Sequence, residues 1–202
     1  SPFEVEEVAQ RFPGVKARAV PLLLFDERDL PELSTASFDE RAGLLFVGGF
    51  MHQPNVDAVQ WLVEEVLPLV RLHLPQVTLT VVGPNPPPEI ANLDRPGVDV
   101  LGRVSEERLA QLYQSHRLVV APLRYGAGIK GKIIESMKYG VPAITTSVGA
   151  EGIANAGQIL FVADEAQGFA AKLVSVYQSQ QLWQAASVES RETIKSHYSK
   201  SA

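Results

Sequence analysis

The sequence predicts an α/β fold built on a doubly wound, mostly parallel sheet, with additional helices at the C-terminal end. From Leu44 onward, short apolar runs alternate with longer segments of helical periodicity, as in parallel sheets covered by helices. Hydrophobic residues make up 46% of the 202 residues, which is enough for one well-buried core. A glycine-rich segment, Gly126 to Gly131, separates a strand-like run from a helix-like one. Such a segment is typical of phosphate-binding turns in these sheets.

Six apolar runs are the expected strands. Val/Ile/Leu-rich runs without polar alternation indicate strands buried on both faces. Thr78, Thr80 and Asp99 interrupt the second and third runs, so we expect those two strands nearer an edge of the sheet. The six runs are Leu44 to Val47, Val77 to Val82, Val98 to Leu101, Leu118 to Ala121, Ala143 to Thr146 and Ile159 to Val162.

Capping residues and apolar stripes predict the helices between these strands. We expect Asn55 and Ser105 to cap two of them, and Pro68 to kink the last turn of the first. Gly140 followed by Pro142 ends a third helix in the usual order. The buried positions expected in the successive helices, including two closing helices, are Val59, Leu62, Val63, Val66 and Val70, then Leu109, Leu112 and Tyr113, then Ile133, Ile134 and Met137, then Phe169, Leu173, Val176 and Leu182.

The first 40 residues have a different pattern. A helix over Glu4 to Phe12 and a strand over Ala17 to Leu24 precede a linker-like stretch rich in Asp, Glu, Pro and Ser. The chain also begins Ser1-Pro2 without Met, so we expect it to be part of a longer protein. We predict three parts: residues 1–40 as the end of a preceding domain with its linker, 41–164 as the Rossmann-like domain, and 165–202 as closing helices.

Composition excludes several classes of function. The formal charge of −5 argues against broad binding to nucleic acid. With no cysteine, the chain has no disulfide, thiolate metal site or cysteine nucleophile. No run approaches the length of a membrane span.

The glycine-rich segment permits three interpretations. Gly126, Gly128 and Gly131 match the G-x-G-x-x-G dinucleotide fingerprint, but after the fourth strand, and no carboxylate follows the next strand to hold a ribose. A phosphate loop, G-x-x-x-x-G-K-[ST], fails at Ile133, which lacks the metal-binding hydroxyl. The third interpretation requires only a diphosphate beside free backbone N–H groups at a helix start, with Lys130 and Lys132 close by.

The motifs resemble the C-terminal domain of the retaining, nucleotide-sugar-dependent group 1 glycosyltransferases, which have two Rossmann-like domains (the GT-B fold). The resemblance is best over Gly43 to Ile153. Its specific part is the second half, Gly128-Ile-Lys-Gly-Lys-Ile-Ile-Glu-Ser-Met137 with Gly140-Val-Pro-Ala-Ile-Thr-Thr146. Phe46-Val-Gly-Gly49, Val81-Val-Gly83 and Leu101-Gly-Arg-Val104 match the first three strands and their glycine turns.

The resemblance implies a role for each matched residue. Glu135 corresponds to the second Glu of the E-x7-E motif and would contact the ribose. Lys130 and the amides of Gly128, Ile129 and Gly131 would face the diphosphate, and Gly102 to Val104, including Arg103, would lie beside the base. Two positions depart from the family pattern: the first Glu of the motif is Ala127, and the Arg that many members carry after the first strand is replaced by Gly49. We still expect Gly49 at the donor-binding site.

We therefore expect the donor-binding half of an enzyme that moves a sugar, of the hexosyltransferase type, from a nucleotide diphosphate sugar to an acceptor hydroxyl. This scheme requires no metal and no cofactor besides the donor. The acceptor-binding half of the same polypeptide is the expected partner, any membrane contact would pass through that half, and the expected location is cytoplasmic. The alternatives are a non-catalytic binding or assembly domain, which Ala127 favours, and a dinucleotide-binding oxidoreductase fragment.

Overall fold

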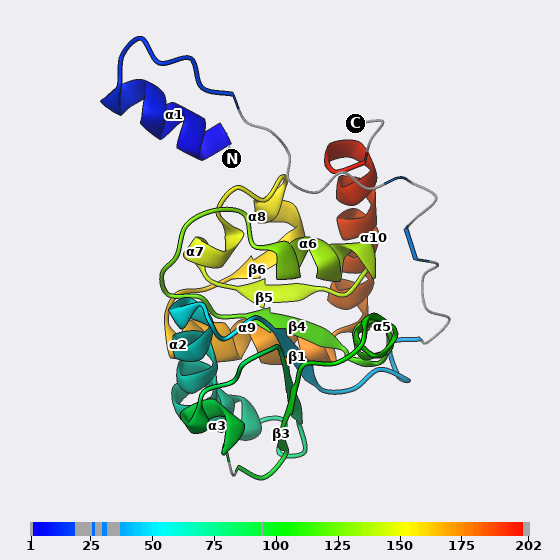
Figure 1. Cartoon of the computed structure of the whole chain (residues 1–202). Helices are drawn as coiled ribbons and strands as arrows, with labels where there is room; N and C mark the ends of the chain where they lie inside the picture. Colours follow the sequence, from blue (N-terminus) through cyan, green and yellow to red (C-terminus); the bar gives the residue numbers. More distant parts are fainter. Residues whose placement is uncertain (1, 19–25, 27–29, 32–36, 94, 200–202) are drawn as a thin grey trace.

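The computed structural model describes residues 2–18, 26, 30–31, 37–93 and 95–199, and its centre is one parallel sheet. The strand order is β3-β2-β1-β4-β5-β6, and every described pairing is parallel (Figure 1). The order reverses between β1 and β4, which is where doubly wound sheets bind ligands at their carboxyl ends. The predicted fold class is confirmed. The strands are β1 (Leu44–Val47), β2 (Leu79–Val82), β3 (Val98–Gly102), β4 (Leu118–Ala121), β5 (Ala143–Thr145) and β6 (Leu160–Val162).

All six predicted strands are present, with ends that differ by at most two residues. Ile159 belongs to the helix before β6 instead of to the strand. β3 lies at the edge and β2 next to it, as the polar interruptions indicated. Thr80 is nevertheless buried. Its hydroxyl is satisfied there by a hydrogen bond of 2.9 Å to Nε2 of His116.

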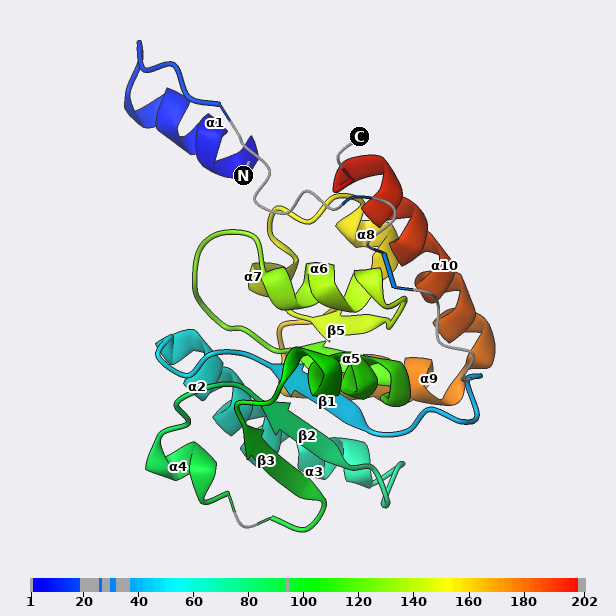
Figure 2. The same ribbon diagram turned by 45° about the vertical axis from the view of Figure 1, so that its right-hand side comes forward.

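Helices cover both faces of the sheet (Figures 1 and 2). Alternate residues of β1 point to opposite faces, so Leu44 and Phe46 pack in one apolar cluster and Leu45 in the other. The first face carries α2 (Gln53–Trp61), η2 (Leu62–Val66), α3 (Leu67–Arg71), α4 (Pro88–Ala91) and α9 (Ala166–Gln178). The second carries α5 (Glu106–Ser115), α6 (Gly131–Lys138), α8 (Ala156–Ile159) and α10 (Gln180–His197), and the short α7 (Ser147–Ala150) follows β5.

Pro68 disturbs its helix as predicted. The segment before it, η2, has π-helical hydrogen bonding between the α-helical segments α2 and α3. Pro68 cannot donate to the carbonyl four residues earlier and its ring clashes there, so a wider turn relieves the conflict. The expected stripe is buried along this composite helix, from Val59 to Val70.

One of the two predicted caps is wrong. The side chain of Ser105 caps α5 by accepting from the backbone N–H of Arg108 at 3.2 Å. Asn55 lies inside α2, whose N-cap residue is His52, and its side chain makes tertiary contacts instead. A buried Asn and an N-cap Asn satisfy the same need for hydrogen bonds, and local sequence does not distinguish them.

The two closing helices are present as α9 and α10. Phe169, Leu173 and Val176 are buried, but Leu182 is 40% exposed and Trp183 is the buried residue in its place. The indole N–H of Trp183 donates to the carbonyl of Arg117 at 2.7 Å, which fixes the rotation of α10 about its axis. None of the helices in the described part of the chain is both long and apolar enough to cross a membrane.

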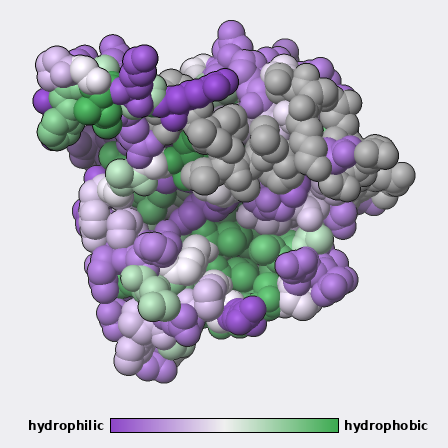
Figure 3. Space-filling model, turned by 45° about the horizontal axis from the view of Figure 1, so that its top comes forward, coloured by the Kyte–Doolittle hydropathy of each residue, from purple (hydrophilic) through white to green (hydrophobic). Residues whose placement is uncertain are grey.

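The N-terminal helix α1 (Pro2–Arg11) confirms the helix expected over Glu4 to Phe12. The strand expected over Ala17 to Leu24 lies outside the described residues beyond position 18. In Figures 1 and 2, α1 projects away from the layers around the sheet. The apolar side chains that follow α1, Phe12 and Val15, are more than half exposed, and Figure 3 shows apolar groups among the polar ones on this projecting piece.

Candidate functional site

The loop between β4 and α6 brings open backbone groups to the carboxyl side of the sheet. Gly126 and Gly128 have φ angles of +118° and +80°, which side chains other than glycine rarely adopt. A Cβ atom at Gly128 or at Gly131 would meet no other atom within 4 Å. Gly131 begins α6, so the first N–H groups of this helix lie beside open space, as an anion site requires.

Lys130 is folded onto this loop. It is the N-cap residue of α6, and its ammonium donates to the carbonyls of Gly126 (3.2 Å) and Gly128 (2.5 Å). The residue is only 8% exposed, and burial lowers its pKa. In this arrangement Lys130 holds the loop and places positive charge at the start of α6.

Lys132 lies where the strand order of the sheet reverses, between β1 and β4. Its Nζ is 2.5 Å from Oδ1 of Asn55 and 4.4 Å from the centre of the Phe46 ring. A Cβ atom added at Gly48 would approach this Nζ to 2.9 Å and the Asn55 side chain to 2.8 Å, so a larger residue there would displace the ammonium or the amide. Burial, and then the charge of Lys130, lower the pKa of Lys132 to about 7.

Asn55 joins the two glycine loops. Its Nδ2 donates to the carbonyl of Gly49 at 2.7 Å while its Oδ1 accepts from Lys132. The sequence analysis expected Gly49 and Lys130 at the donor site and Lys132 close to the diphosphate, but it did not expect Asn55 there. One signal was available: Lys132 lies four residues before Ser136, which is fully buried, so both share the face of α6 that meets the sheet.

Glu135 lies on the second turn of α6. Its carboxylate pairs with the ammonium of Lys138 at 3.1 Å, and its side chain remains 32% exposed. Beside it, the rings of Tyr113 and Tyr139 stack with centres 5.0 Å apart. Burial, with the nearby charge of Glu135, raises the pKa of Tyr113. Glu135 is thus accessible to a hydroxyl-bearing ligand, and it needs no ligand to satisfy its charge.

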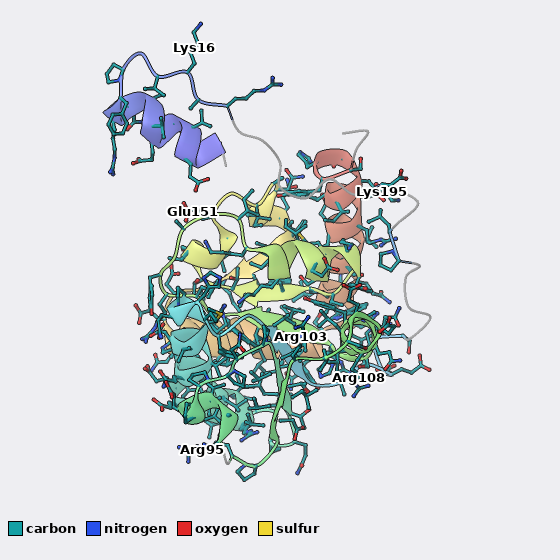
Figure 4. The ribbon with its side chains drawn as sticks, in the orientation of Figure 1. Lys16, Arg95, Arg103, Arg108, Glu151 and Lys195 are labelled. Carbon is teal, nitrogen blue, oxygen red and sulfur yellow. The ribbon has the colours of Figure 1, made fainter. Side chains whose placement is uncertain are left out.

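The structure separates the remaining candidates. Arg103 follows β3 and is exposed, and Figure 4 shows it near the start of α5. β3 is two strands away from β1 in the sheet, so Arg103 does not lie beside the point where the strand order reverses. Arg124 makes a two-point contact with Asp57, at 2.5 and 3.0 Å. His52 is an exposed residue at the start of α2. Of the named candidates, Gly49, Lys130 and the glycines of the β4–α6 loop lie around the point where the strand order reverses, between β1 and β4.

The structure does not favour a phosphate loop with a metal. Ile133 is fully buried in the position where such a loop carries a hydroxyl. The carboxylate of Asp164, which follows β6, accepts from the backbone N–H and the hydroxyl of Ser147, each at 2.7 Å, and so caps α7. Among the residues that the structure describes, no three His, Asp or Glu side chains are grouped as a metal site.

Several solved structures share this fold. S. aureus TarM, in a mutant complex that includes UDP, matches with a TM-score of 0.79 and 16% identity over 98% of this chain and 40% of that one. The lipopolysaccharide-biosynthesis glycosyltransferase WaaG matches at 0.70 and 18%, over 93% of this chain and 55% of that one. The C-terminal domain of a group 1 glycosyl transferase from Francisella tularensis, LpcC, matches over its whole length and 90% of this chain, at 0.63 and 15%.

Sequence comparison assigns the family. An uncharacterized 44.6 kDa protein of the Klebsiella pneumoniae cps region is 28% identical over 140 residues, which are 65% of this chain and 36% of that protein. The chain thus spans well under half the length of this relative and of TarM. The family model described as glycosyl transferases group 1 matches residues 41–179, more than half of the chain. The chain belongs to the group 1 glycosyl transferases.

Proposed function

We propose that this chain binds the nucleotide diphosphate sugar in a two-domain hexosyltransferase that transfers the sugar to an acceptor hydroxyl. The observation that carries the proposal is the pair of lysines, Lys130 and Lys132, beside the open N-terminus of α6. Cations are disfavoured at the positive end of a helix dipole, so two lysines there call for an anion. A diphosphate supplies two negative charges at the required place.

The other groups suit the remaining parts of such a donor. Glu135, one turn further along α6, would accept from ribose hydroxyls, and the segment Gly102 to Val104, of which Arg103 is exposed, would lie beside the base. Solved proteins of the same fold support this reading: S. aureus TarM and pneumococcal GtfA have both been crystallised with UDP.

The chemistry would be electrostatic. As the bond from the anomeric carbon to the diphosphate oxygen breaks, negative charge grows on the leaving diphosphate and positive charge on the sugar ring. The α6 amides, Lys130 and Lys132 would stabilise the leaving group. The acceptor oxygen would bond to the anomeric carbon as its proton passes to the departing diphosphate oxygen. This scheme uses no metal ion.

The acceptor would be held by a second domain that this chain does not contain. The matched portions of TarM and of the Klebsiella relative are well under half of those proteins. The exposed apolar side chains Phe12 and Val15 suit a segment that packs on such a domain. Domain closure would then exclude water from the reacting groups, and this chain alone would bind donor without transferring sugar. We place the whole enzyme in the cytoplasm, with any peripheral membrane contact made by the second domain.

Ala127 supports one rival function, a domain that binds nucleotide without catalysis. It replaces the first Glu of the family's E-x7-E motif and brings no polar group toward a sugar. Such a domain would bind a nucleoside diphosphate as tightly as the corresponding nucleotide sugar. A donor-binding domain would prefer the nucleotide sugar.

Thermal unfolding with added ligands tests the proposal. UDP, GDP, ADP, their sugar conjugates and NAD would each be added at millimolar concentration. A ligand at 100 times its Kd adds about 2.7 kcal/mol of stability, which raises the midpoint measurably. We expect one base to raise it, and Lys130→Ala to reduce the effect. Lys195→Ala is the control, because Lys195 lies on the exposed part of α10 (Figure 4). A shift with NAD alone, or with no ligand, would overturn donor binding by this chain.

A further inference from the structure

Lys132 is enclosed without a counter-charge. Its ammonium contacts an aromatic ring (Phe46) and a neutral amide (Asn55), and it lies beside Gly48, where an added Cβ would come within 2.9 Å. It forms no ion pair with any carboxylate among the described residues. A partly buried ammonium with these neighbours is poorly compensated for the water that it loses.

The charged groups of the neighbouring elements do not supply a counter-charge for Lys132. On α2, the carboxylate of Asp57 is engaged by Arg124, and His52 at the helix start is exposed. On its own segment, Lys132 has Lys130 as the charged neighbour, which adds repulsion. These surroundings favour the neutral amine, consistent with a pKa of about 7 for Lys132 in the ligand-free chain.

A bound diphosphate would reverse the balance. Two negative charges within a few ångströms of Nζ, in a partly desolvated site, stabilise the ammonium strongly. The open space beside Gly128 and Gly131 lies at the start of the helix that carries Lys132, so the anion and the amine would meet there.

We propose that, above neutral pH, Lys132 is largely neutral in the empty site and takes up a proton from solvent when the diphosphate of the donor binds, so that in this range affinity for the nucleotide sugar falls as the pH rises. This inference rests on the proposed function, because it assumes that the anion is a diphosphate. The sign follows from linkage: when the complex holds more protons than the free protein, raising the pH opposes binding.

Isothermal titration calorimetry measures the proton directly. UDP-glucose and GDP-mannose are titrated into the chain at pH 6, 7, 8 and 9, in buffers of different ionisation enthalpy. Their diphosphates are esterified at both ends and do not titrate in this range, unlike a phosphate monoester with its pKa near 6. At pH 8 to 9 we expect uptake approaching about one proton per bound nucleotide sugar, and affinity that falls up to about tenfold per pH unit.

Substitutions assign the proton to Lys132. Lys132→Arg keeps a charge that does not titrate below pH 12, so we expect binding without proton uptake and with little pH dependence. Lys132→Met should lose most of the affinity at pH 6, where the wild-type amine is charged. Lys195→Met is the matched control, and we expect it to behave as the wild type.

The outcomes separate the inference from the proposed function. Tight binding with no proton uptake at pH 8, or the same uptake in Lys132→Arg, would overturn the role of Lys132 and leave donor binding standing. Absence of binding to either nucleotide sugar or to UDP and GDP, at pH 6 as well as at pH 8, would overturn both. The unfolding midpoint of each variant without ligand shows whether a lost interaction is due to misfolding.

Discussion

Asn55 and Lys132, 77 residues apart in the sequence, are joined by a 2.5 Å hydrogen bond. The bond lies where the strand order of the sheet reverses, between β1 and β4. The same Asn55 side chain donates to the carbonyl of Gly49, so one amide ties α2 to the first glycine loop and to α6. Because the amide is uncharged, it orders the ammonium of Lys132 without neutralising it. These contacts join the two glycine loops before any ligand binds, without adding a negative charge beside Lys132.

Replacing Asn55 should destabilise the fold. In Asn55→Ala the carbonyl of Gly49 and the ammonium of Lys132 both lose a partner in a partly buried place. Leaving buried polar groups unpaired costs about 1–3 kcal/mol. Urea unfolding at pH 7 measures the loss in free energy of unfolding. Asn92→Ala, at an exposed position, is the control and should change it by less than about 0.5 kcal/mol. Equal effects at the two positions would contradict the bridging role of Asn55.

Stability should rise with pH above 7 because of Lys132. Its pKa is about 7 in the folded chain, against the ordinary lysine value of 10.5 in the unfolded chain, so between these values the unfolded chain binds more protons. The free energy of unfolding then increases with pH, by at most about 1.4 kcal/mol per unit for this group. Urea unfolding at pH 7, 8 and 9 should show a steeper rise for the wild type than for Lys132→Met. If the free energy of unfolding rose equally with pH in the two proteins, Lys132 would not be the cause of the rise.

The titrations of His116 and Tyr113 fall outside this window. Burial lowers the pKa of His116 from 6.5, so that histidine affects stability below pH 7. The pKa of Tyr113 is raised above its usual value of 10. Subtracting the Lys132→Met curve also removes any contribution from Lys130, which is present in both proteins.

Local sequence was sufficient for the scaffold. The strands follow from continuous apolar runs, since a parallel strand covered on both faces has no polar side, and the cap at Ser105 follows from its neighbours in the chain. Leu182 was predicted to be buried and is exposed, because the rotation of α10 is set by Trp183, which reaches the carbonyl of Arg117. That contact joins residues 66 positions apart, and periodicity alone cannot specify it.

The site was only partly predictable, for the same reason. Glycines and lysines before a helix indicate an anion site, because the chemistry depends on residues that are close in sequence. The contact between Asn55 and Lys132 depends on how β1 and β4 pair, and an Asn before an apolar stripe is equally consistent with a cap. All the donor-site roles stay predictions: those of Gly49, Arg103, Gly128, Ile129, Lys130, Gly131 and Glu135.

Thr80→Val should cost stability although the two side chains have similar shapes. Nδ1 of His116 lies 2.7 Å from the carbonyl of Leu112, which makes it the donor, so Nε2 accepts from the Thr80 hydroxyl. Valine leaves this buried nitrogen without a partner, at about 1–3 kcal/mol. Thr78→Val is the matched control at an exposed position two residues earlier. Urea unfolding compares the two, and a larger loss in Thr78→Val would be inconsistent with the assigned hydrogen bond.

Arg124→Met should loosen the β4–α6 loop more than it destabilises the fold. The Arg124–Asp57 pair is exposed on the arginine side, and such pairs contribute at most about 1 kcal/mol to global stability. The pair nevertheless holds the loop against α2 near Gly126, where an added Cβ atom would lie 3.3 Å from the Pro54 ring.

Amide hydrogen exchange distinguishes these two effects. We expect faster exchange across residues 124–131 in Arg124→Met and unchanged exchange in the strands, because local opening of the loop does not require global unfolding. Arg95→Met, at an exposed position before β3, is the control (Figure 4). Nucleotide affinity should fall with the loss of loop protection, since an ordered loop presents its amides without further entropy loss on binding. If the loop stayed protected in Arg124→Met, its order would come from the lysine contacts at Gly126 and Gly128 instead.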